Sequence, residues 1–466
     1  MIKKLLNRIL ITLICYGVRF IKQQPNFNNM NILLITPPVF MPTVMSYSLA
    51  MMNAVLTSSL KEEISVLDLN AIWHYNEFQD FYEKKEDYFS VLTEFVNKTR
   101  QIYPSISKDV LASKKPLGYD KIMQQILDKK PDVVAISLTY NSQIFFAKTI
   151  ISELQEKGIK VVLGGPADYS KIMQGTTILP NFEKLVEHLV SLGANKQKNK
   201  FVLDYTLFDK KYYLTKDIIY PLRTAHSCPY QQCTFCTHHG DSKYECFDLN
   251  IIKDTIVKNK MKKVCFIDDD FTIGHLKELS KILKPLNVQW WCQLRPLKEL
   301  ITILPELYET GLRSVAWGVE SGNQRVLNDI KKGTKVSEIE KVLETAKELG
   351  IKNILYVLFG FPTETEEEFM QTVEFLEKNT NNIDLISTSI FGLQQGSKVF
   401  SSPKQFGLKE IKLSPRTYLS DKVSYLSFGL SSEEVKKLKK KHSARINKIN
   451  KIPKVIAACK EQVLNL

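Results

Sequence analysis

The sequence predicts an α/β fold made of two successive α/β units and a helical C-terminal tail. Short apolar runs suited to buried parallel strands recur along most of the chain, and segments of helical character separate them. Such alternation implies right-handed crossovers and parallel sheets. The 466 residues suffice for two domains, and hydrophobic and charged contents of 44% and 24% are ordinary globular values.

The first unit, residues 30–192, is expected to form a doubly wound, flavodoxin-like or Rossmann-like parallel sheet. An aromatic and charged helical insertion, 71–130, interrupts its alternation. Ligands of such sheets bind at the carboxyl ends of the strands. Pro37 and Pro38 end the first strand, and Gly164 and Gly165 end the last. The expected strands are 31–36, 64–70, 132–137 and 160–166, and the expected helices are 46–60 and 143–157.

A linker at 193–217, rich in Lys and Asn at its start, is expected to lead into the second unit, 218–410. Strands and helices alternate again in this unit. Trp290 and Trp291 are expected in its core, because large aromatic side chains in a strand pack inside more often than they stack on a ligand. The segments expected to carry strands are 218–222, 263–272, 288–296, 314–327, 355–365 and 386–390.

The net charge of +14 is concentrated at the C-terminal end of the chain. Residues 431–466 hold ten Lys or Arg against three Asp or Glu, which is about half of the excess. The run 436–441 is interpreted as a solvated helix face within a basic, helical region at 411–466, and no nucleic-acid partner is expected. In the extension 1–29, basic residues precede an apolar run, 9–18, too short to span a bilayer. A helix packed on the domain, or peripheral membrane contact, is expected there.

Three of the eight cysteines, Cys228, Cys233 and Cys236, fall within nine residues. A tight loop of this kind can point three thiolates at one centre, which predicts a metal-cluster cradle. A four-iron cluster normally takes four thiolates, so three leave one iron open for chemistry. A structural zinc site completed by His238 or His239 is the alternative, and inert buried thiols are another. So few cysteines in so long a chain fit a reducing cytoplasm rather than a disulfide framework, and Cys15 apart, the others are expected to be structural: Cys246, Cys265, Cys292 and Cys459.

The spacing Cys-x4-Cys-x2-Cys, with Phe235 before the last cysteine, resembles the cluster loop of radical S-adenosylmethionine (SAM) enzymes. Their commoner spacing, Cys-x3-Cys-x2-Cys, has one residue fewer. The resemblance implies that Cys228, Cys233 and Cys236 bind a 4Fe–4S cluster. It also implies that the open iron chelates SAM, which is cleaved to a 5′-deoxyadenosyl radical.

Further segments of the second unit are similar to the same family. With the cluster loop, they indicate a partial (β/α)6 TIM-like barrel whose site lies at the carboxyl ends of its strands. Thr363 stands where relatives have glycine, and Thr363 and Thr365 equally resemble helix caps. Arg295, at a strand end, is suited to pair with a carboxylate of cofactor or substrate. The SAM contacts implied by the resemblance are Asp269 and Asp270 in Phe-Ile-Asp-Asp-Asp-Phe-Thr, Glu320 and Ser321 in Gly-Val-Glu-Ser-Gly, and Gly360 and Pro362 in Gly-Phe-Pro-Thr-Glu-Thr.

The first unit resembles the cobalamin-binding domain of cobalamin-dependent radical SAM enzymes. The resemblance rests on the strand ending Pro37-Pro38, the segment 66–70 and the strand ending Gly164-Gly165-Pro166, and it implies cobalamin contacts at these Pro and Gly residues. The Asp-x-His-x-x-Gly motif that supplies an axial histidine elsewhere is absent, and 176–183 replaces the Gly-Glu-Gly-Glu stretch common in relatives. A flavodoxin-like accessory domain without a cofactor is the alternative.

Together these features predict a cytoplasmic radical SAM enzyme that performs cobalamin-dependent C-methylation of an unactivated carbon. The alternatives are radical rearrangement, cyclisation or oxidation without methyl transfer, and a zinc-stabilised basic binding protein. A flavodoxin- or ferredoxin-type electron donor is the expected partner. The substrate, a small molecule or a peptide, and any further catalytic residue are not identified by the sequence.

Overall fold

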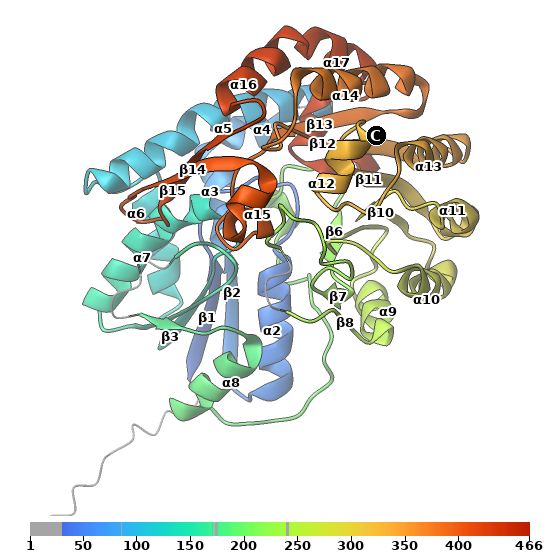
Figure 1. Cartoon of the computed structure of the whole chain (residues 1–466). Helices are drawn as coiled ribbons and strands as arrows, with labels where there is room; N and C mark the ends of the chain where they lie inside the picture. Colours follow the sequence, from blue (N-terminus) through green and yellow to red (C-terminus); the bar gives the residue numbers. More distant parts are fainter. Residues whose placement is uncertain (1–29, 85, 170, 173–175, 239–241) are drawn as a thin grey trace, which may run out of the picture.

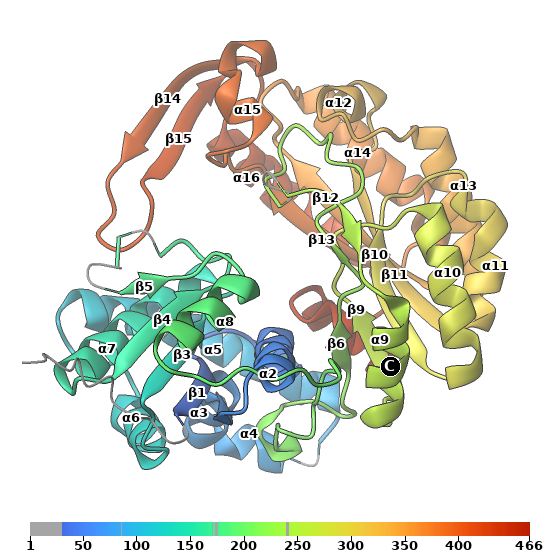
Figure 2. The ribbon, with the colours of Figure 1, turned by 90° about the horizontal axis from the view of Figure 1, so that it is seen from below.

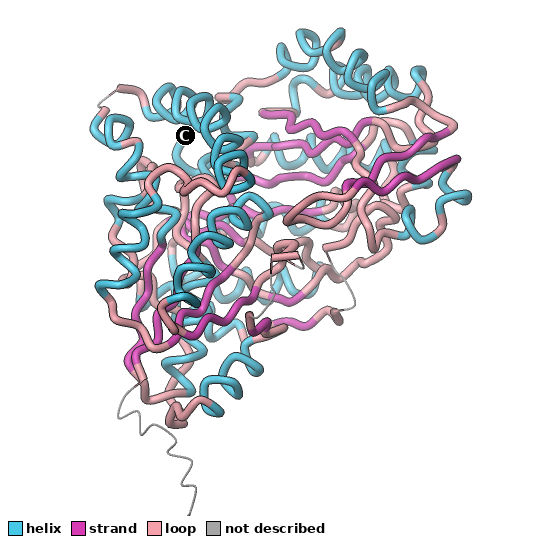
Figure 3. The backbone as a smooth tube through the Cα atoms, turned by 90° about the vertical axis from the view of Figure 1, so that its left-hand side faces the viewer, coloured by secondary structure: helices cyan, strands magenta, loops and turns pink. Residues whose placement is uncertain are grey.

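The computed structural model describes residues 30–84, 86–169, 171–172, 176–238 and 242–466. Two parallel sheets with helices packed on them form its two units (Figures 1 and 3). The N-terminal extension and its predicted helix lie outside the described residues, as does His239. Among the helices described, none is both long enough and apolar enough to cross a membrane.

The first sheet has five parallel strands in the order β2-β1-β3-β4-β5, which confirms the predicted doubly wound sheet. Its second strand ends earlier than predicted, because Asp68 is the N-cap of the next helix and accepts a hydrogen bond from the Ala71 amide at 3.0 Å. The strands are β1 (Asn31–Thr36), β2 (Glu63–Asp68), β3 (Val133–Ser137), β4 (Lys160–Gly164) and β5 (Thr177–Ile178).

Helices cover both faces of this sheet. Alternate residues of β1 point to opposite faces, so Ile32 and Leu34 join one buried cluster while Leu33 and Ile35 join another. On the first face lie α2 (Tyr47–Ser59) and α8 (Phe182–Ser191), and on the second lie α3 (Leu69–Glu77), α5 (Tyr88–Leu111), α6 (Tyr119–Asp128) and α7 (Ile144–Glu156), with the short α4 (Gln79–Glu83) following α3. The predicted helical insertion thus corresponds to the α3–α6 region.

The predicted linker packs along the first unit instead of hanging free of it. The Lys61 amide donates to the Asn195 carbonyl at 2.9 Å, and the Gln197 amide donates to the Ser59 carbonyl at 2.7 Å. Further along, the Tyr213 hydroxyl donates to the buried Asp68 carboxyl at 2.8 Å. These bonds attach the segment between the units to the edge of the first sheet.

The second sheet has six parallel strands in the order β13-β12-β11-β10-β9-β6, as expected of a partial (β/α)6 barrel. Alternate residues of its strand β10 (Gln289–Leu294) point to opposite faces: Trp290 faces the helices and Trp291 faces the interior of the barrel. Both side chains are buried, which confirms them as core residues. The strands are β6 (Tyr220–Leu222), β9 (Lys263–Phe266), β10 (Gln289–Leu294), β11 (Leu312–Glu320), β12 (Lys352–Phe359) and β13 (Leu385–Ile390).

Helices cover the outer face of the barrel and pack against the outward residues of its strands. A small antiparallel pair, β7 (Ala225–His226) with β8 (Glu245–Cys246), follows the first barrel strand. The helices are α9 (Leu249–Lys258), α10 (Ile273–Leu283), α11 (Leu300–Glu309), α12 (Gln324–Asp329), α13 (Val336–Glu348), α14 (Glu366–Lys378) and the short α15 (Lys398–Ser401).

The C-terminal region is only partly helical, so the prediction of a helical segment from residue 411 is wrong at its start. Strands β14 (Leu408–Ser414) and β15 (Lys422–Ser427) pair as an antiparallel hairpin. The period-two alternation of apolar residues at 411, 413, 423 and 425 favours strands, and the basic composition of the tail concealed it. Helices α16 (Ser432–Lys441) and α17 (Ser443–Ile449) follow, and the lysines of α16 are mostly exposed, as predicted.

The hairpin and the C-terminal tail both connect the two units. The hairpin extends from the barrel to the first unit (Figure 2). Lys171, in the loop after β4, pairs with Asp421 at 2.7 Å, and Tyr418 contacts Phe145 of α7 edge to face. The tail packs inside the barrel, where Val463 and Leu464 join the inner side chains of the strands. Residues far apart in sequence therefore enclose the ends of the barrel strands.

Candidate active site

The cysteine loop begins at the carboxyl end of β6, where a buried carboxylate fixes the backbone. One oxygen of Asp268 accepts hydrogen bonds from the Thr224 amide at 2.9 Å, the Ala225 amide at 2.8 Å and the Thr224 hydroxyl at 3.0 Å. His275 also contacts the Thr224 hydroxyl at 2.7 Å. Burial raises the pKa of Asp268 to about 7, against the effect of these hydrogen bonds.

The middle of the loop rests on the segment after α12. The Thr234 amide donates to the Ile330 carbonyl at 3.0 Å, and the Tyr230 hydroxyl donates to the Lys331 carbonyl at 2.9 Å. A Cβ placed on Gly333, which has φ +73°, would meet the Tyr230 hydroxyl at 2.4 Å. This glycine is therefore required by both its backbone conformation and the close approach of the loop.

The three predicted cluster ligands, Cys228, Cys233 and Cys236, are half-buried free thiols of this single loop. Burial raises the pKa of Cys233 to about 11, and it also raises the pKa of Cys236. Within the described part of the chain, no three His, Cys, Asp or Glu side chains form a group placed to hold a metal ion. The donor chemistry of the loop suits an iron–sulfur cluster, which takes thiolates.

Aspartates at the end of β9 orient cationic side chains around the loop. Asp269 pairs with Arg223 at 2.8 Å and contacts the His238 ring at 3.5 Å, and this contact raises the pKa of His238. Asp270 is buried and accepts from the Arg295 Nε at 2.7 Å. Asp269 and Asp270 are thus brought to the loop as predicted, but each is already engaged by an arginine.

Arg295 connects the third barrel strand to the cysteine loop. Its guanidinium carbon lies 3.6 Å from the ring centroid of Tyr230, and its Nη1 donates to the Lys332 carbonyl at 3.3 Å. Stacking of this kind is a cation–π contact, stronger where water is excluded. Arg295 therefore holds Tyr230, and with it the loop, against the ends of β9 and β10.

A buried ion pair lies at the end of β11. Lys332 Nζ is 2.8 Å from Glu320, and their side chains are only 8% and 12% exposed. Burial lowers the pKa of the Lys332 ammonium, but Glu320, Cys233 and Asp270 more than reverse this and leave the pKa above its ordinary value. Glu320 has φ +65°, so a non-glycine residue holds a left-handed conformation at the predicted site. The neighbouring Ser321 is buried and its hydroxyl lies 2.9 Å from that of Thr372.

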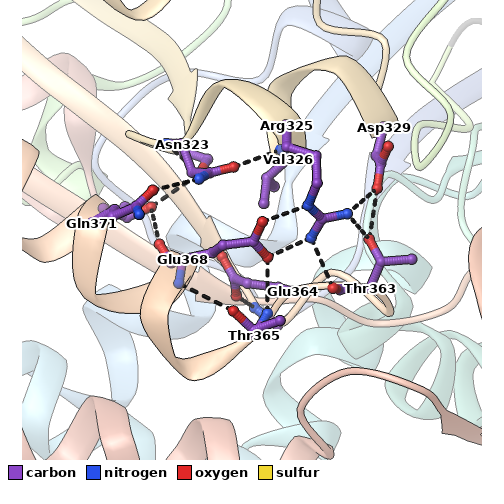
Figure 4. A network of polar contacts seen from close by, with 12 residues as sticks. Asn323, Arg325, Val326, Asp329, Thr363, Glu364, Thr365, Glu368 and Gln371 are labelled. Carbon is purple, nitrogen blue, oxygen red and sulfur yellow. Dashed lines mark hydrogen bonds and ion pairs between the residues drawn. The ribbon is translucent and has the colours of Figure 1, made fainter.

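The segment containing Gly360 and Pro362 is held by a polar network around Arg325 (Figure 4). Arg325 donates to the Thr363 carbonyl at 2.8 Å and pairs with Asp329 and Glu368. Thr365 caps α14 in a capping box with Glu368, which confirms the cap interpretation for this residue. Thr363 donates to Asp329 at 2.7 Å, so in the structure it ties the segment to α12.

The predicted cobalamin contacts lie at the carboxyl edge of the first sheet. A Cβ on Gly165, which has φ +116°, would meet the Leu138 carbonyl oxygen at 2.2 Å, and one on Gly164 would meet the Leu179 carbonyl oxygen at 3.3 Å. Packing between neighbouring loops is therefore a sufficient reason for Gly165. The side-chain amide of Gln143 donates to the Pro37 carbonyl at 2.7 Å and joins the ends of β1 and β3 beside Pro38. Contact of Pro37, Pro38, Gly164 and Gly165 with cobalamin at this edge stays a prediction.

A cavity of about 650 Å³ lies between α2, α8 and the β7–β8 pair. Its lining includes Tyr47, Phe182, Arg223, His226 and Glu245, and none of the predicted cofactor-binding residues. Arg223, which lines this cavity, also pairs with Asp269 beside the cysteine loop and so connects the two regions.

Sequence reasoning missed several residues that build the site. Asp268 anchors the start of the loop, Tyr230 stacks on Arg295, and Lys332 pairs with Glu320. The three consecutive acids at 268–270 were a signal for the first; Asp268 and Asp270 are buried, and Asp269 is not. Lys332 stands in a Lys-Lys pair that resembles any solvated surface. Only its position in the fold distinguishes it.

The comparisons with known proteins define the class. Residues 222–376 match the family model of the radical SAM superfamily. The structure superposes on TsrM, a radical SAM methyltransferase of Kitasatospora setae with bound cobalamin and 4Fe–4S cluster, with a TM-score of 0.59 at 15% identity, over 90% of this chain and 91% of that one. It superposes on OxsB, a cobalamin-dependent radical SAM enzyme, with a TM-score of 0.59 at 11% identity, over 90% of this chain and 67% of that one.

The chain therefore contains a radical SAM domain, and the doubly wound sheet that precedes this domain belongs to a fold shared with TsrM over most of both chains. The radical SAM domain implies a 4Fe–4S cluster and SAM. In sequence, the chain is 26% identical over 170 residues to an uncharacterised methyltransferase of Pyrococcus horikoshii. That match covers 33% of this chain and only about a third, 36%, of the relative.

Proposed function

We propose that this protein is a cobalamin-dependent radical SAM methyltransferase that methylates an unactivated carbon. The observation that carries the proposal is the joint placement of the two units. The cysteine loop and the charged strand ends of the barrel lie in one domain, and a doubly wound sheet shared with two cobalamin enzymes precedes it. The methyltransferase names of several relatives support the same reaction class.

When bound, the cluster with SAM supplies the 5′-deoxyadenosyl radical, and methylcobalamin supplies the methyl group. The residues of the chain hold and orient these groups. Cys228, Cys233 and Cys236 would be the cluster ligands. Arg295 and Lys332 hold the loop and the end of β11 in place through their ion pairs with Asp270 and Glu320. Asp269, which pairs with Arg223 and contacts His238 beside the loop, is the carboxylate that would meet the amino group of SAM.

The sheet edge of the first unit meets the barrel through the tail. The Thr43 hydroxyl, in the loop after β1, donates to Glu461 at 2.8 Å, and Gln462 donates to the Thr43 carbonyl at 3.0 Å. Burial raises the pKa of Tyr140, which follows β3, and the nearby charge of Glu461 raises it further. A cofactor at the carboxyl edge of the first sheet would therefore lie next to the barrel interior, as transfer of a methyl group requires.

The proposal extends to partners and location. A flavodoxin- or ferredoxin-type protein would supply the electron that the cluster needs, and an enzyme with an oxygen-labile cluster would work in the cytoplasm. Any contact of the N-terminal extension with a membrane surface belongs to the same proposal. The substrate is a small molecule or a peptide.

The test is anaerobic reconstitution followed by assays of iron, sulfide and bound corrinoid on the same sample. About four irons per chain, a corrinoid, and methylation products after dithionite and SAM are the expected result. Replacing Cys228, Cys233 or Cys236 with Ala should abolish cluster binding, whereas Cys246→Ala, an exposed cysteine of the same region, should leave it intact. Iron and 5′-deoxyadenosine without corrinoid would instead favour radical chemistry without methyl transfer, and zinc alone would refute the enzyme proposal.

A further inference from the structure

The C-terminal tail closes the interior of the barrel at the level of its lower strand residues. Ile456, Val463 and Leu464 of the tail are buried against Cys265 and Trp291 on the inner face of the sheet. The tail is held from the first unit as well, because the Tyr88 hydroxyl donates to Gln462 at 2.7 Å. The floor of the barrel is thus formed by residues 456–464, which lie far along the chain from its first strand, β6.

Lys460, on this tail, places its ammonium inside the barrel. Its Nζ lies 5.0 Å from the ring centroid of Tyr356. Tyr356 is an inner-face residue of β12, because its neighbours Leu355 and Val357 belong to the outer core. The Lys460 ammonium therefore lies over the ring of Tyr356 on the inner face of β12. The neighbouring strand, β11, ends at Glu320.

In the described part of the chain, no Asp or Glu oxygen lies within 4.0 Å of Lys460 Nζ to form an ion pair. The adjacent Glu461 is instead engaged by the Thr43 hydroxyl at 2.8 Å and the Gln462 amide at 3.3 Å. By contrast, the two cations at the strand ends are paired with carboxylates, Arg295 with Asp270 and Lys332 with Glu320. Burial lowers the pKa of Lys460, as expected for an ammonium whose charge is incompletely compensated.

Two large side chains that follow the carboxyl ends of strands are exposed, one in each unit. Ile267, which directly follows β9 in the barrel, is 37% exposed. Tyr140, which reaches the same region from the first unit, is 51% exposed, and the charges of Glu461 and Cys265 act on its pKa after burial. A ligand between the first unit and the barrel strands would meet these surfaces together with the ammonium.

We propose that Lys460 binds an anionic group of the substrate, a carboxylate or a phosphate, at the floor of the barrel. This assignment rests on the proposed function and adds to it the substrate class. An ammonium partly removed from water on an aromatic ring gains most from a partner of opposite charge, because the low local dielectric strengthens the attraction. Such a pairing would orient the substrate with its anionic end at the floor and its reacting carbon toward the strand ends.

The test measures protection of Lys460 from acylation and needs no turnover. The full chain, with its cofactors as purified, is treated briefly with acetic anhydride in acetate, in methyl phosphate or in chloride of equal ionic strength. Peptide mass spectrometry gives the labelling rate of Lys460 and of Lys437, an exposed lysine of α16 that serves as the internal control. A further arm contains SAM alone in chloride.

We expect acetate or methyl phosphate to slow labelling of Lys460 at least threefold relative to chloride, with Lys437 unchanged. Equal rates at Lys460 in all three salts would overturn the proposal, as would equal slowing at both lysines, which is a general salt effect. Protection by SAM alone equal to that by the anions would assign the ammonium to the cofactor and so overturn the substrate assignment. Because the labelling needs neither methyl transfer nor substrate, its failure is distinct from failure of the proposed function.

Discussion

The ion pair between Lys332 and Glu320 should stabilise the fold far more than an ion pair on the surface. Its side chains are 8% and 12% exposed and 2.8 Å apart, so Lys332→Met leaves a carboxylate with little water and no cation. Removing one partner of such a buried pair costs about 3–5 kcal/mol. We expect about 3 kcal/mol for Lys332→Met, measured as the loss of free energy of unfolding in urea at pH 7.

Two further variants turn this value into a test of mechanism. Lys341→Met removes a lysine from an exposed pair with Glu344, whose atoms are 3.7 Å apart, and should cost less than about 0.5 kcal/mol. The double variant Lys332→Met with Glu320→Gln removes both buried charges and should recover about 2 kcal/mol relative to Lys332→Met alone. If Lys332→Met costs no more than Lys341→Met, or if the double variant recovers nothing, the pair is not the source of the stability.

Three other predictions concern single positions. Burial raises the pKa of Asp68 from 3.8 to about 6, so as the pH rises the folded state keeps this proton longer than the unfolded state does. The free energy of unfolding should therefore fall as the pH rises from about 4 through 6. Asp68→Asn should remove about 2–3 kcal/mol of that fall, measured by urea titration at each pH. Gly322→Ala should lower the free energy of unfolding by about 1–3 kcal/mol, because the new Cβ would lie 2.4 Å from the Cβ of Phe375. Gly274→Ala, in the first turn of α10, has open space around the new Cβ and should raise the free energy of unfolding by up to about 1 kcal/mol. Melting temperatures that shift in the same direction for both variants would contradict this. Arg325→Lys should lower the free energy of unfolding by about 1 kcal/mol, because an ammonium cannot match the forked contacts of the guanidinium with Thr363, Asp329 and Glu368. The effect is modest because the Arg325 side chain is 45% exposed. An unchanged midpoint of urea unfolding would argue against the network of Figure 4.

Much of the fold was predictable because parallel strands buried on both faces are continuous apolar runs. The segments 31–36 and 132–137 illustrate this, and both form strands within a residue of the predicted bounds. The hairpin 408–427 was missed for the opposite reason. One face of the hairpin is exposed to solvent, so its apolar residues alternate with polar and charged ones. This alternation lies in a segment whose basic composition was interpreted as helical.

The sequence by itself determined the chemistry that the site offers. Three thiols within nine residues predict a metal cluster without knowledge of the fold, because local spacing limits which donors meet. The motifs at 266–272 and 318–322 were identified by their resemblance to segments of radical SAM enzymes, and each follows an apolar run. Their common location followed from the rule that parallel strands end at one edge.

Only the tertiary structure decided how those groups are paired. It assigned Asp268 to the backbone of the cysteine loop, gave Asp270 to Arg295, and joined Lys332 to Glu320 across twelve residues. It also brought Lys460 into the barrel from the far end of the chain. No local pattern marks such residues, because burial of a charge depends on what the rest of the chain packs around it, and that is settled only when the whole chain folds.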